Sequence, residues 1–222
     1  MADLRTIFGD RLHSVVAYGA HVEGATETPL RLLALVTSVG SLDLEACARH
    51  AERWRRGGVA IPLILPKDEF RQSLDAFPLE YGEIRRSHQL VFGADPFEGV
   101  DIAVADVRRA CETQIKSHLI HLREGFIQAS GDPAAIADLV SGSAPAFTAL
   151  LRHVARLANA TAADRAEATM LGGRAADLPE RVVVDLMTLE RSRSVPVDAG
   201  RLFPEYLAAV EQLSRAVDAW RA

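Results

Sequence analysis

The residues best suited to hold a charged ligand form a short loop near the N-terminus, Gly19-Ala20-His21-Val22-Glu23-Gly24. Glycine has no β-carbon, so the backbone of such a loop approaches a ligand closely and turns N–H groups toward phosphate oxygens. His21 adds a side chain that becomes cationic on protonation, and Arg31 adds a permanent cation. These residue types predict a phosphate-binding loop. The alternative is a plain turn between two core strands, because glycines are common in turns.

Strands on either side of the loop must position it. Residues 14–18 form a β-branched and aromatic run that predicts a strand, and residues 31–36 are apolar enough for a strand buried on both faces. Residues 60–65 predict a further strand, and residues 43–56 predict a helix. Residues 79–84 alternate with period two, which predicts a strand that carries Glu80 and Glu83 on opposite faces.

This order of strand, glycine loop and strand resembles the opening of the nucleotidyltransferase superfamily, the DNA polymerase β-like fold. The likeness covers roughly residues 5 to 130 and extends to a bacterial nucleotidyltransferase-like subgroup. In that family a Gly-Ser loop holds the nucleoside triphosphate, and an Asp-x-Asp pair before the second strand holds divalent metals. The resemblance, with the loop chemistry, gives the candidate ligand- or phosphate-binding residues: Gly19, Ala20, His21, Gly24 and Arg31.

The sequence departs from the family at the residues that matter most. Ala20 replaces the serine of the loop, and Pro29-Leu30-Arg31 stands in place of Asp-x-Asp. Two-metal chemistry needs carboxylate oxygens around cations roughly 3.5–4 Å apart. Proline offers no side-chain ligand, and arginine repels a metal. We therefore expect the fold without the metal site: no catalytic residue, no metal and no cofactor.

The sequence is compatible with three functions. The favoured one is a degenerate nucleotidyltransferase that binds a nucleotide, a phosphate ligand or a partner without chemistry. The second is an active, magnesium-dependent nucleotidyltransferase that uses displaced acids, namely Glu23, Glu27, Glu80 and Glu83. The third is a scaffolding protein with a vestigial pocket. An ion pair between Arg31 and Glu83 would replace the metal and close the pocket.

The second half of the chain is predicted to form helices connected by short loops. We expect an α/β nucleotidyltransferase-like domain with a mixed sheet over residues 1–102 and an all-α helical bundle over residues 103–222. The expected helices begin at Asp106, at Pro133 after an Asp132 cap, after Pro145, at Arg181 and near Phe203. His118 and His121 share a helix face with Glu124 and form a conceivable metal pair, for which the sequence assigns no further ligand.

Composition sets broad limits on the partners. The chain has 222 residues, 49% hydrophobic and 25% charged, with a net charge of −5. These values are typical of a globular protein and argue against broad nucleic-acid binding. We expect no signal peptide, no membrane span and a cytoplasmic location, with Cys47 and Cys111 as reduced thiols. Exposure of Phe203 and Trp220 would favour a homodimer through the helical domain.

Overall fold

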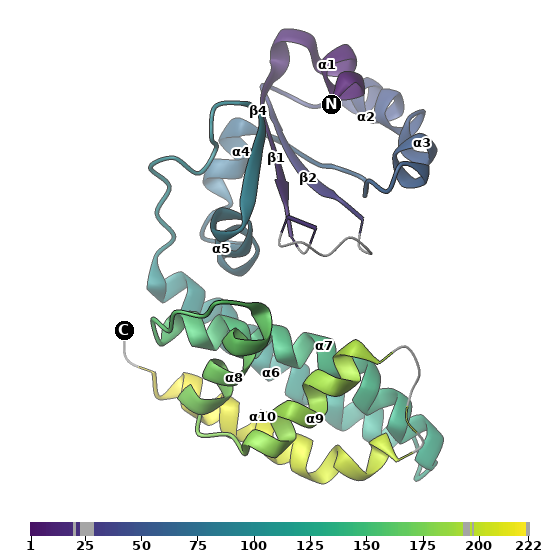
Figure 1. Ribbon diagram of the computed structural model, residues 1–222, viewed down its shortest axis with the longest axis vertical. Coiled ribbons are helices and arrows are strands. Elements are labelled where there is room, and N and C mark those ends of the chain that lie inside the picture. Colours follow the sequence, from purple (N-terminus) through teal and green to yellow (C-terminus); the bar gives the residue numbers. More distant parts are fainter. Residues whose placement is uncertain (20, 23–28, 193–195, 197, 221–222) are drawn as a thin grey trace. The chain divides into compact units, whose positions relative to one another are not determined.

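The protein forms two compact units, Met1–Ala103 and Val104–Ala222. This computed structural model describes residues 1–222 apart from residues 20, 23–28, 193–195, 197 and 221–222 (Figure 1). The first unit combines helices with a mixed sheet, and the described elements of the second are all helices. The expected fold class, an α/β unit followed by a helical bundle, is confirmed.

The sheet of the first unit has four strands in the order β3-β2-β1-β4. Their bounds are β1 Leu12–Tyr18, β2 Arg31–Val36, β3 Leu63–Pro66 and β4 His88–Gly93. The central strand β1 pairs antiparallel with β2 and β4, whereas β2 pairs parallel with β3. The runs at 14–18 and 31–36 are strands as predicted, whereas the strand predicted over 60–65 begins only at Leu63.

Helices cover both faces of this sheet, which explains why β2 is apolar along almost its whole length. Helices α1 (Ala2–Phe8), α2 (Ser41–Ala48) and α3 (Ala51–Arg56) lie on one face, and α4 (Lys67–Gln72) and α5 (Pro78–Arg86) lie on the other (Figure 1). The alternation of a strand divides its side chains between two cores. The first core takes Val15, Ala17, Leu32, Ala34 and Val36, and the second takes Val16, Leu33, Leu35, Phe70, Tyr81, Ile84 and Phe97.

Two predictions about the first unit are wrong. Residues 79–84 belong to helix α5 and not to a strand. Pro78 opens this helix, Glu80 stands in its first turn, and Tyr81 and Ile84 face the core three residues apart, so helical signals outweigh the period-two alternation. The helix expected over residues 43–56 is two helices, α2 and α3, separated at Arg49 and His50.

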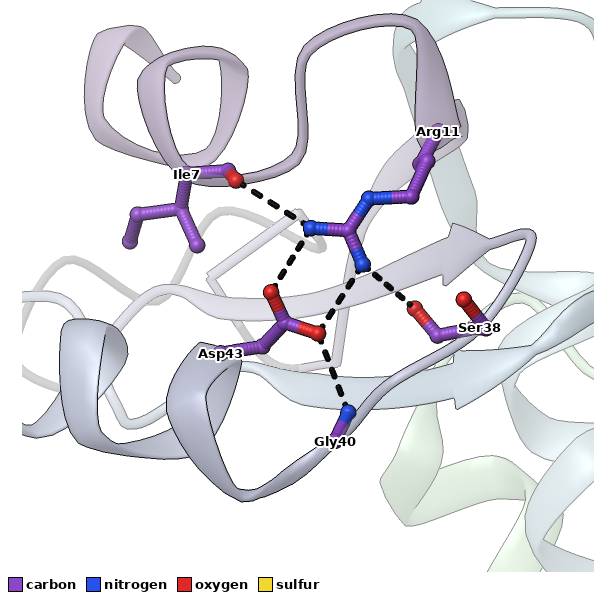
Figure 2. A network of polar contacts seen from close by, with 5 residues as sticks. All are labelled: Ile7, Arg11, Ser38, Gly40 and Asp43. Carbon is purple, nitrogen blue, oxygen red and sulfur yellow. Dashed lines mark hydrogen bonds and ion pairs between the residues drawn. The ribbon is translucent and has the colours of Figure 1, made fainter.

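A polar network joins the start of β1 to the start of α2 (Figure 2). The Arg11 guanidinium donates to both carboxylate oxygens of Asp43, at 2.7 and 2.9 Å, and also to the Ser38 and Ile7 carbonyls. The Gly40 N–H donates to the same carboxylate at 3.0 Å. The hydrogen bonds from Arg11 and then from Gly40 lower the pKa of Asp43 to about 2. Bidentate pairing of this kind fixes geometry as well as charge.

We expect Arg11→Gln to lower the thermal midpoint of the first unit, because it leaves the Asp43 carboxylate without its strongest partner. Since the folded-state pKa of Asp43 is depressed, this contribution is complete above about pH 4 and is lost as the pH falls through about 2. The difference between native protein and variant should therefore shrink in acid. Arg56→Gln removes an exposed pair with Glu52 and is the control that should change little. Equal midpoints for native protein and Arg11→Gln at neutral pH would contradict the expectation.

The second unit is arranged around one long helix. Its helices are α6 Val104–Gln128, α7 Pro133–Leu157, α8 Arg165–Ala175, α9 Glu180–Arg191 and α10 Phe203–Asp218. Helix α7 contacts all the others, and its N-cap Asp132 accepts from the Ala134 N–H as predicted. The predicted break at Pro145 is wrong, because α7 continues through it. Buried neighbours such as Ala144 and Phe147 hold the helix together across the proline. Helix α8 was not predicted, and Asp106 lies inside α6 instead of capping it.

Two apolar features of this unit differ from expectation. By length and composition α7 would suffice to cross a membrane, although its side chains such as Phe147 and Leu151 are core residues here. Phe203 is buried and stacks on Phe126 with ring centroids 4.1 Å apart, so it lacks the exposure that would favour a homodimer. The homodimer stays a prediction, without the support that an exposed Phe203 would lend it.

The histidines of α6 serve structure within the described residues. His118 Nε2 lies 2.6 Å from the Tyr206 hydroxyl of α10, and the Phe147 ring of α7 packs near both side chains. Burial first, and the nearby His121 second, lower the pKa of His118 to about 4. His121 pairs instead with Glu124 at 3.1 Å on the exposed face of α6. The two histidines therefore have different partners.

Candidate functional site

The candidate loop begins where β1 ends. Gly19 follows Tyr18 with a φ of +84°, a conformation that strongly favours glycine. Its carbonyl accepts from the Val22 N–H at 2.9 Å, and His21 and Val22 lie in a turn. A β-carbon at Gly19 would lie 3.6 Å from Arg31 Cδ, which shows that the Arg31 side chain runs beside the turn. Glycine is therefore required at position 19 by its backbone conformation. The Arg31 side chain is a neighbour of this turn.

The other loop residues divide into two groups. His21 is exposed in the turn. Ala20, Glu23, Gly24 and Glu27 lie outside the described residues, and their proposed roles stay predictions. Arg31, the permanent cation, is the first and exposed residue of β2.

A row of three side chains crosses the sheet at this end. Tyr18 of β1 pairs with Arg31 of β2 on one side and with His88 of β4 on the other. Residues directly opposite each other on antiparallel strands project from the same face. This is the face covered by α4 and α5, because Tyr18 packs against the second core. The pairing thus gathers a cation, a phenol and an imidazole from three separate strands.

His88 is held rigidly within this row. Its Nδ1 donates to the Ile84 and Arg85 carbonyls at 3.1 and 3.0 Å, and its Nε2 lies 3.1 Å from Asp95 Oδ1. The same carboxylate accepts from the Phe97 N–H. These contacts tie the C-terminal end of α5 to β4 and to the turn that follows. His88 was not predicted as a site residue, since its partners are set by tertiary structure.

Tyr18 and Arg31 act on each other electrostatically. Burial raises the pKa of the Tyr18 phenol, and the positive charge of Arg31 partly opposes that rise. The phenol therefore remains a neutral hydrogen-bond donor at ordinary pH. Within the described part of the chain, neither the Tyr18 hydroxyl nor the Arg31 guanidinium has a hydrogen-bond or ion-pair partner, and neither group is fully buried. Both are in place to meet a ligand.

The four described strands of the sheet carry no carboxylate side chain. The sequence has no acid between Glu27 and Asp43, so no register of β2 restores an Asp-x-Asp pair. Among the described residues, no group of three His, Cys, Asp or Glu side chains is arranged to hold a metal. Glu80 and Glu83 lie on α5, away from the strands where they were expected. The ion pair between Arg31 and Glu83 stays a prediction.

The expected DNA polymerase β-like fold is supported by comparison with a solved structure. A solved structure with this fold is spectinomycin adenyltransferase AAD(9) from Enterococcus faecialis with ATP and spectinomycin, to which the chain is similar with a TM-score of 0.62. The similarity covers 98% of this chain and 96% of that chain, at 13% sequence identity. At this identity the likeness establishes the fold and not the activity. No family model and no curated protein matches the sequence.

Proposed function

We propose that the protein is a nucleotidyltransferase-like protein that has lost catalysis and binds the phosphate groups of a nucleotide without metal. One observation carries the proposal: Arg31 stands beside the Gly19 turn in a sheet whose described strands contain no acid. The solved structure of similar fold contains ATP, which supports a nucleotide as the ligand class. Two isolated, buried thiols, Cys47 and Cys111, support a cytoplasmic location.

Electrostatics favours an anion over a cation at this position. Two like unit charges 4 Å apart repel by about 4 kcal/mol at an effective dielectric constant near 20, and the repulsion of a divalent ion is larger. The same guanidinium attracts a phosphate and donates paired hydrogen bonds to its oxygens. An arginine next to the glycine turn therefore replaces the bridging role of a metal with a direct contact.

Calorimetric titration of ATP into the purified protein in EDTA tests this proposal. We expect binding without magnesium, and we expect Arg31→Ala to weaken it at least about tenfold, because a hydrogen bond to a charged group contributes roughly 1.5–3 kcal/mol. Arg55→Ala is the matched control, since Arg55 is an exposed arginine of α3 on the same unit. Its affinity for ATP should equal that of the native protein.

A turnover assay supplies the second half of the test. With magnesium and ATP, in the presence or absence of spectinomycin as an acceptor, we expect no release of pyrophosphate. Sustained magnesium-dependent release would falsify the loss of catalysis and would point to the displaced acids. Binding that requires magnesium, or that Arg31→Ala leaves unchanged, would overturn the metal-free site.

A further inference from the structure

The hydroxyl of Tyr18 is a second hydrogen-bond donor for an anion bound beside Gly19 and Arg31. Tyr18 immediately precedes Gly19, and its Cα lies directly opposite that of Arg31 in the β1–β2 ladder. Opposed residues on antiparallel strands have β-carbons about 4.5–5.5 Å apart, so their side chains are able to reach one small ligand together. The positive charge of Arg31 also partly opposes the rise that burial causes in the pKa of this phenol.

The Tyr18 hydroxyl is also not engaged by other described residues. The Tyr18 ring packs against the second core, while its hydroxyl has no partner among the described residues and is not among the fully buried polar atoms. Tyr81, on α5 in the same core, contrasts with it: its hydroxyl lies 2.9 Å from Ser73 Oγ and is already used. One tyrosine of this core is therefore structural, and the other offers its hydroxyl to solvent or to a ligand.

We infer that Tyr18 is a ligand-binding residue of this site, whose hydroxyl donates a hydrogen bond to the same phosphate group that Arg31 contacts. This inference rests on the proposed function. It assigns two contacts to the phosphate, the permanent cation of Arg31 and the neutral hydroxyl of Tyr18, which come from opposed strands. A phosphate oxyanion suits this pair because it accepts several hydrogen bonds at once. His88, on the other side of Tyr18, has both ring nitrogens engaged and serves as a positioning residue.

Tyr18→Phe tests the inference, because it keeps the ring in the core and removes only the hydroxyl. We expect its affinity for ATP in EDTA to fall about tenfold, while its thermal midpoint stays close to that of the native protein. Tyr81→Phe is the matched control: it should lose stability through the Ser73 contact and keep its affinity for ATP. In Tyr18→Phe, Arg31→Ala should cost less affinity than it does in the native protein if the two side chains share one phosphate.

Inorganic pyrophosphate separates a phosphate contact from a contact with the base. If Tyr18 contacts phosphate, Tyr18→Phe lowers the affinity for pyrophosphate and the affinity for ATP by the same factor. A loss confined to ATP would overturn the inference and leave the proposed function standing. If Tyr18→Phe leaves the affinity for both compounds unchanged while Arg31→Ala lowers it, the inference is also overturned and the proposed function still stands. Failure of the native protein to bind either compound would overturn the proposed function and this inference with it.

Discussion

Replacing Gly172 with alanine is expected to destabilise the helical unit by about 3 kcal/mol or more, the upper end of the range for an overpacked interior. Gly172 lies on α8 where that helix crosses α7. A β-carbon there would lie 1.8 Å from the Leu151 carbonyl oxygen. The obstacle is backbone and not a flexible side chain, so the two helices would have to separate. Urea unfolding followed by far-ultraviolet circular dichroism measures the loss.

Gly142→Ala provides the matched control within the same unit. A β-carbon at this helical glycine of α7 meets nothing within 4 Å. Alanine is favoured over glycine in a helix interior by roughly 0.8–1.0 kcal/mol, so this variant should be as stable as the native protein or more so. The expectation fails if Gly172→Ala unfolds at the native urea concentration, or if both alanine variants lose stability equally.

The helical unit should also lose about 3 kcal/mol of stability between roughly pH 6.5 and pH 4 through His118 alone. Its pKa is lowered from 6.5 to about 4 in the folded protein, chiefly by burial, so the unfolded chain binds the proton first. Stability is therefore complete above the unfolded pKa and falls as the pH drops toward the folded one. Protonation of Nε2 would also prevent it from accepting the Tyr206 hydroxyl hydrogen bond.

Urea unfolding at a series of pH values measures this effect. His118→Gln cannot gain a proton in this range, so its stability should depend less steeply on pH than that of the native protein. His121→Gln, on the same helix, is the control: its side chain is exposed, and its removal leaves the larger contribution of burial to His118 in place. Parallel pH profiles for native protein and His118→Gln would rule out this role.

Short-range patterns were sufficient for much of the fold. Residues 31–36 were read as a doubly buried strand because almost every side chain is apolar, and both cores indeed draw on them. The Asp132 cap and Pro133 start were equally local. The strand assigned to residues 79–84 failed because six residues that alternate can also place Tyr81 and Ile84 on one helix face. Local signals of strand and helix overlap at that length.

The site was only partly predictable for a related reason. The turn at Gly19 and the position of Arg31 follow from sequence order. The row from Arg31 through Tyr18 to His88 depends on strand register, and Tyr18 and His88 stand 70 positions apart in the chain. The engagement of His88 with the end of α5 depends on a helix that was read as a strand. Pairings of this kind are set by tertiary packing and leave no local pattern.

The double burial of β2 bears on how readily this strand could accommodate a metal-binding acid. Leu33 follows Arg31 on the same face and is only 1% exposed, within a core that includes Phe70 and Leu35. A carboxylate introduced there would lose its hydration against apolar side chains before any cation was present to offset that cost. An acid in place of Leu33 would thus lower stability before it could contribute to metal binding.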